Sequence, residues 1–128
     1  MTGAVTLISA LTVLALAAAC DGHDDGASQW SSTVAGLCTA TEQAAAGDAG
    51  DARRTFLDES HDALHRLADE VTELDRALAT GLLEAKERVE AGLEAGSPSL
   101  PADLDGLVDA TRAAVRITDD PVPSACSQ

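Results

Sequence analysis

Residues Asp51–Ala95, DARRTFLDESHDALHRLADEVTELDRALATGLLEAKERVEAGLEA, decide the fold of this chain. The stretch is rich in good helix formers and contains no proline. Apolar residues recur along it at intervals of seven: Leu57, Leu64, Val71, Leu78 and Ala85. This spacing predicts one long helix with a heptad-like apolar seam on one face. If straight, the helix would be roughly 65 Å long, and we expect any bend or break at Thr80–Gly81.

Shorter helices are predicted on both sides of this stretch. Residues 29–46 carry apolar side chains three and four apart, which is the spacing of one helical face. Residues 102–117 repeat that spacing, and the prolines beyond them favour an extended tail. The candidate N-terminal caps are Ser28, Ser31 or Ser32 for the first helix and Asp48 or Asp51 for the second. No segment alternates polar and apolar residues, so we expect an all-α fold, a three-helix hairpin or bundle with one long central helix and no sheet.

The chain opens with an uncharged apolar run that ends in Leu16-Ala17-Ala18-Ala19-Cys20. Small residues before a cysteine, at the end of such a run, resemble the lipobox of a bacterial lipoprotein signal peptide. The resemblance implies cleavage before Cys20, a diacylglycerol on its thiol and acylation of the new amino group. It places the protein on the extracytoplasmic face of the cell membrane. An uncleaved membrane span is the alternative, but residues 4–19 are fewer than the roughly 20 apolar residues that a span needs.

The whole layout resembles small, alanine-rich lipoproteins of high-GC Gram-positive bacteria, a group without an assigned activity. The resemblance rests on Cys20, on the excess of arginine over lysine and on the Ala/Asp/Gly-rich segment after Cys20. It divides the chain into a signal peptide (1–19), a lipidated polar tether (20–28) and a helical domain (29–128). It implies no particular ligand.

The other two cysteines, Cys38 and Cys126, are expected to form a disulfide. If Cys20 carries the lipid, they remain as a pair, and such a pair in an exported protein is typical of a disulfide. If the helices fold back at about residues 49 and 98, Cys38 and Cys126 both come to the level of about residue 61. The bond would close nearly the whole domain and contribute roughly 4 kcal/mol to stability.

The charge of the chain and the motifs it lacks argue against several classes of function. The formal net charge is −14, which disfavours contact with nucleic acid. The sequence contains no Gly-x-Ser-x-Gly motif and no glycine-rich phosphate loop. We therefore expect no enzymatic activity and no cofactor. The predicted role is a lipid-anchored binding or envelope-interaction module, whose protein or metal-ion partner the residues do not identify.

The alternative function is a divalent metal-binding lipoprotein. His61 and His65 lie four residues apart, so on a helix both imidazoles project from one side, close enough to share a zinc or copper ion. Asp58 and Asp69 lie on or next to the same stripe and could complete the site. A His-x-x-x-His pair is also common among ordinary solvated side chains at the margin of a core, and this remains the competing interpretation.

Asp75 is unusual because it falls inside the apolar seam of the central helix. A buried carboxylate needs a partner. Arginines of the third helix or nearby ones can provide it, and the candidates are Arg112, Arg116, Arg76 and Arg53. We expect a structural ion pair, with a ligand-binding acid as the alternative.

Overall fold

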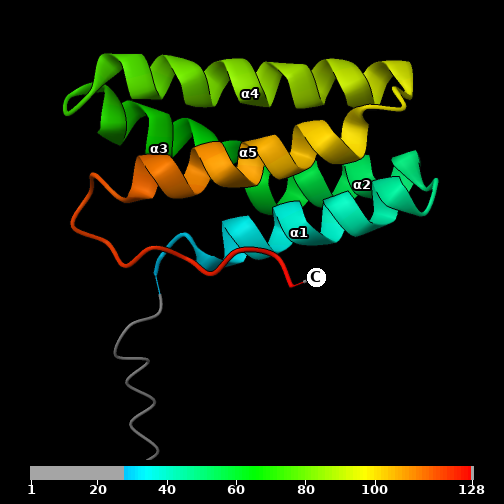
Figure 1. The fold of residues 1–128 in the computed structure, drawn as a ribbon, viewed down its shortest axis with the longest axis horizontal. Helices are drawn as coiled ribbons and strands as arrows, with labels where there is room; N and C mark the ends of the chain where they lie inside the picture. Colours follow the sequence, from blue (N-terminus) through cyan, green and yellow to red (C-terminus); the bar gives the residue numbers. More distant parts are fainter. Residues whose placement is uncertain (1–27, 128) are drawn as a thin grey trace, which may run out of the picture.

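A computed structural model describes residues 28–127 as an antiparallel bundle of helices. In chain order these are α1 (Ser31–Ala45), α2 (Ala49–Phe56), the π-helical turn η1 (Leu57–His61), α3 (Asp62–Thr72), α4 (Arg76–Ala95) and α5 (Leu100–Val115). Because α2, η1 and α3 follow one another without a gap, the bundle has four rods (Figure 1). Within the described residues there is no strand, so the all-α fold class is confirmed. The predicted signal peptide, Cys20 and most of the tether lie outside these residues.

The rods pack around one core. α1 contacts both α2 and α5, whereas α4 contacts both α3 and α5 (Figure 1). The largest fully buried side chains come from all four rods: Leu37, Phe56, Leu64, Leu67, Leu82, Leu104 and Leu107. No helix among residues 28–127 combines the length and apolar character needed to span a bilayer.

The predicted long central helix is interrupted, which is why the bundle has four rods and not three. The break lies at residues 73–75, between α3 and α4, and not at Gly81, which is an exposed residue within α4. Asp75 has an extended backbone (φ −152°, ψ 99°), and its carboxylate accepts the N–H of Leu78 as the N-terminal cap of α4. The predicted buried ion pair of Asp75 is therefore wrong. Aspartate stabilises a helix start far better than a helix interior.

The π-helical turn η1 changes which residues of the second rod face the core. A π turn contains one residue more than an α turn, so side chains before it are rotated relative to those after it. Leu57, predicted in the seam, is 45% exposed, whereas Phe56 is fully buried. Ser60 is also buried, and its hydroxyl donates to the carbonyl oxygen of Thr33 across the α1 interface (2.9 Å).

Of the remaining predicted caps, the one at Asp48 is confirmed, whereas the serine cap of the first helix (Ser28, Ser31 or Ser32) is wrong. Asp48 caps α2, its carboxylate accepting the N–H of Asp51 (3.1 Å). Pro101 lies in the first turn of α5, where its missing N–H costs nothing. α1 has no side-chain cap, because Ser28 accepts the N–H of Trp30 just before the helix begins.

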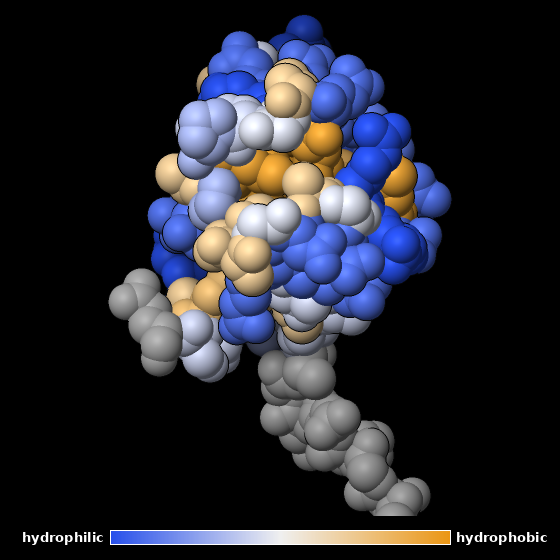
Figure 2. Space-filling view, turned by 90° about the vertical axis from the view of Figure 1, so that its right-hand side faces the viewer, coloured by the Kyte–Doolittle hydropathy of each residue, from blue (hydrophilic) through white to orange (hydrophobic). Residues whose placement is uncertain are grey.

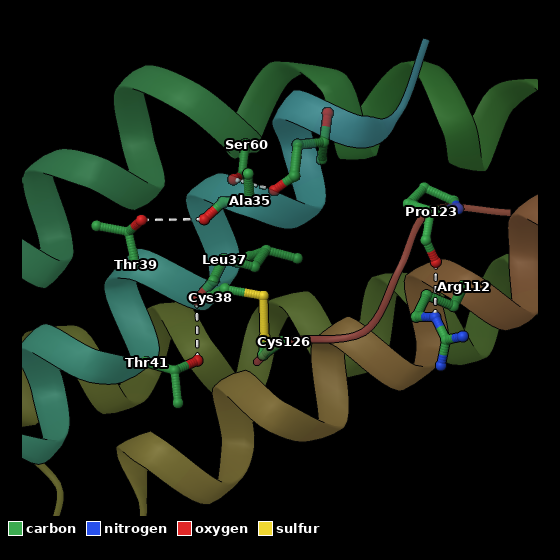
Figure 3. The surroundings of a disulfide bond; sticks show 10 residues. Ala35, Leu37, Cys38, Thr39, Thr41, Ser60, Arg112, Pro123 and Cys126 are labelled. Atoms are coloured by element: carbon green, nitrogen blue, oxygen red, sulfur yellow. Dashed lines mark hydrogen bonds between the residues drawn. A yellow bond between two sulfur atoms is a disulfide. The ribbon is translucent and has the colours of Figure 1, made fainter. Parts of the chain in front are cut away.

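The disulfide between Cys38 and Cys126 is confirmed, with Cα atoms 5.3 Å apart (Figure 3). It holds the extended tail against α1, and Arg112 of α5 donates to the carbonyl oxygen of Pro123 in the same tail (2.9 Å). Gly36, two residues before Cys38, faces Glu59 and Ser60 of η1, so the disulfide lies near the predicted level of about residue 61.

Alanine substitutions at two helical glycines are expected to change the stability of the domain in opposite directions. A Cβ on Gly36 would lie 2.8 Å from both Glu59 Cβ and Ser60 Oγ, whereas a Cβ on Gly81 would meet nothing within 4 Å. Gly36→Ala is expected to destabilise the domain by about 1–2 kcal/mol, because overpacking outweighs the gain in helix propensity. Gly81→Ala is expected to stabilise it by about 0.5–1 kcal/mol. Urea unfolding of both variants measures the difference, and the same sign for both would contradict the close contact at Gly36.

Candidate functional site

His61 and His65 do lie side by side, as their spacing predicts. Their ring centroids are 4.9 Å apart. His61 is partly buried at the end of η1, and both of its ring nitrogens face carboxylates. Nδ1 lies 3.0 Å from Asp62 Oδ1, and Nε2 lies 3.1 Å from Glu90 Oε1 on α4. The hydrogen bond from His61 lowers the pKa of the Asp62 carboxyl below its ordinary value.

The predicted metal site is not assembled in the described part of the chain. Within residues 28–127, no group of three or more His, Cys, Asp or Glu side chains is placed to hold a metal ion. Asp58 and Asp69 are exposed and are not drawn into a ligand set with His61 and His65. The π turn is the physical reason on the Asp58 side, because it rotates the residues before His61 relative to those after it.

A buried lysine, which sequence reasoning missed, completes the cluster around His61. Lys86 is the only lysine in the chain, and its side chain is 4% exposed. Its ammonium donates to the same Glu90 oxygen that faces His61, at 2.6 Å. Glu90 of α4 therefore lies at the contact with η1, where one of its oxygens faces both Lys86 and His61. The available sequence signal was a lone lysine next to an apolar seam position, Ala85, in a chain that otherwise uses arginine.

A hollow of about 310 Å³ opens beside this cluster, between α2 and the C-terminal half of α4. Its lining is Arg53, Phe56, Leu57, Glu90, Leu93 and Glu94. At the end of the bundle that faces the viewer in Figure 2, apolar surface lies in a depression surrounded by polar side chains. Two carboxylates and one guanidinium around an apolar floor suit a small ligand, or a side chain, with an apolar body and a charged end.

A second hollow, of about 350 Å³, runs between α1 and the tail beside the disulfide. Its polar surface is contributed by Ser31, Glu42, Ser124 and Ser127, and it contains no cationic side chain. The hollow at Glu90 is the stronger of these two candidates, because it combines an apolar floor with a neighbouring buried, charged cluster. Comparisons of the chain with family models, with curated proteins and with solved structures gave no match.

The Lys86–Glu90 pair makes a prediction about stability. Glu90→Ala would leave a buried ammonium without its acceptor, and we expect the free energy of unfolding to fall by about 2 kcal/mol. This is less than the value for a fully buried pair, because Glu90 is 34% exposed. Lys86→Met keeps the apolar stem and removes the buried charge, so its effect is expected to be close to zero. Urea unfolding at neutral pH compares the two, and equal losses would contradict the assignment of Lys86 as a buried charge.

Proposed function

We propose that the protein is a lipid-anchored lipoprotein on the extracytoplasmic face of the cell membrane, acting as a binding or envelope-interaction module and not as an enzyme. The observation that carries the proposal is that two of the three cysteines are bonded to each other. Cys38 and Cys126 bond to each other, which leaves Cys20, at the end of the lipobox-like run, for the anchor. A disulfide that closes most of a domain is typical of exported proteins, which agrees with this compartment.

The hollow beside Glu90 is the site that we assign to binding in this proposal. It lies between α2 and the C-terminal half of α4, whereas the chain toward Cys20 leaves from the N-terminal end of α1. Those two places are at opposite ends of the bundle (Figure 1). A site at the end away from the anchor stays accessible to a partner in the envelope.

Substitution of Cys20 tests the anchor. Without a thiol the diacylglycerol has no attachment point. The membrane fraction of the Cys20→Ser variant is therefore expected to contain no lipidated protein. The variant is expected to be released or to accumulate as an unprocessed precursor. The measurement is membrane fractionation with immunodetection in a bacterial host that processes lipoproteins.

The control is the double variant C38S/C126S, which removes the other two cysteines and retains Cys20. It is expected to stay lipidated and in the membrane fraction. Equal distribution of Cys20→Ser and the unsubstituted protein, at equal gel mobility, would contradict the proposed anchor.

A further inference from the structure

The large apolar side chains that remain exposed are concentrated at one end of the bundle. Four such residues occur in the described part of the chain: Leu57, Leu74, Ile117 and Val122. Leu74 connects α3 to α4 and is 59% exposed, while Ile117 and Val122 follow α5 and are each 39% exposed. Because α4 and α5 run antiparallel, the start of α4 and the end of α5 lie at the same end (Figure 1). We call Leu74, Ile117 and Val122 the apolar tip.

The tip is also the place where the chain leaves toward Cys20. Asp120, between Ile117 and Val122, accepts hydrogen bonds from the indole N–H of Trp30 (2.9 Å) and from the amide of Gln29 (2.6 Å). These bonds fix the start of the domain against the tip. The start of the domain is thus held against the segment that carries Ile117 and Val122.

The length of the chain before the domain limits how far the tip can stand from the lipid. Seven residues lie between Cys20 and Ser28, and the eight residue steps that join the two span at most about 28 Å when fully extended. Helix α4, with 20 residues, is about 30 Å long. The tether is therefore no longer than the bundle, and the tip is the part of the domain held closest to a lipid on Cys20.

We propose that the apolar tip rests on the membrane beside the anchor, with Leu74, Ile117 and Val122 at the boundary between phospholipid headgroups and acyl chains. Transfer of apolar side chains from water to this depth lowers the free energy of the system. The inference rests on the proposed lipid anchor. It orients the domain with the end that carries the Glu90 hollow away from the bilayer.

The charged side chains next to the tip are of both signs and include cationic groups that can meet lipid phosphates. Exposed arginines lie close to the apolar residues in the sequence, Arg76 near Leu74 and Arg116 next to Ile117, where guanidinium groups can reach lipid phosphates. Four carboxylates lie nearby as well. Those of Asp75 and Asp120 accept hydrogen bonds from the N–H of Leu78 and from Trp30 and Gln29, whereas Glu73 and Asp119 are exposed. This mixture of signs suits a zwitterionic headgroup layer better than a strongly anionic one.

Fluorescence quenching by lipid tests this orientation on the full mature chain. With Cys20 lipidated and Cys38 bonded to Cys126, an added cysteine is the only free thiol and can be labelled with an environment-sensitive fluorophore. The labelled variants are Leu74→Cys and Val122→Cys, with Leu57→Cys as the matched control. Leu57 is similarly exposed (45%) but lines the hollow at the other end. Each is reconstituted into phosphatidylcholine vesicles that contain acyl chains brominated near the headgroup.

We expect the labels at Leu74 and Val122 to shift to the blue and lose fluorescence in brominated vesicles, and the label at Leu57 to do neither. Adding Ile117→Ser to the Leu74 label is expected to reduce the quenching. Vesicle flotation of the same samples separates the two proposals. Protein that floats with equal, weak quenching at all three positions overturns the tip inference and leaves the anchor intact. Protein that does not float overturns the anchor and the tip together.

Discussion

Replacement of both Cys38 and Cys126 by serine is expected to lower the free energy of unfolding by about 4–5 kcal/mol, the largest effect of any substitution considered for this domain. The bond joins residues 88 apart, so its loss frees nearly the whole unfolded chain. The hydrogen bonds that also hold the tail, such as Arg112 to Pro123, contribute only about 1 kcal/mol each. At about 4–8 °C per kcal/mol for a domain of this size, the melting temperature should fall by at least about 15 °C.

Thermal unfolding followed by circular dichroism measures this loss, and reducing agent provides the control. Reduction should lower the melting temperature of the unsubstituted protein to near that of the serine variant, and should leave the variant unchanged. A fall of less than about 5 °C in both experiments would mean that the tail is dispensable for the bundle.

Phe56→Ala is the second large prediction, and its neighbour serves as the control. Phe56 is fully buried and lies edge-on to His61, with ring centroids 6.0 Å apart. Removal of a buried phenyl ring costs about 3–5 kcal/mol. Leu57→Ala, at the next position, is expected to cost about 1 kcal/mol or less, because that side chain is 45% exposed.

The comparison also tests the π turn, because a continuous heptad would bury Leu57. Urea unfolding of the two variants distinguishes these arrangements. A larger loss for Leu57→Ala than for Phe56→Ala would show that the second rod has the regular helical register and that η1 is absent.

The sequence predicted what depends on local spacing and failed where a single residue had two competing roles. The outer helices, the Asp48 cap and the cysteine pair all followed from periodicity, cap chemistry and count. The break at Asp75 did not, because its place in the apolar period suggested burial while its side chain favoured capping. The π turn was also missed, since the seven-residue spacing continues through it and only the packing of Ser60 against α1 shows the shift.

The candidate site was predictable only in part, for a similar reason. The proximity of His61 and His65 is a property of one helix and follows from their spacing. The contacts of His61 and Lys86 with Glu90 and the hollow beside them depend on which faces of η1 and α4 meet. That meeting requires the hairpin at residues 73–75, whereas the sequence placed any bend or break at Thr80–Gly81.

Intact-protein mass spectrometry of the membrane-purified protein measures at once the proposed lipid on Cys20 and the disulfide between Cys38 and Cys126. The predicted mass is that of residues 20–128 with one disulfide, plus a diacylglyceryl group and an amide-linked acyl chain if the new amino group is also acylated. Treatment with an alkylating agent under denaturing, non-reducing conditions should add nothing to this mass. A mass without any lipid would rule out the anchor at Cys20, and a mass that rises on alkylation would rule out the disulfide.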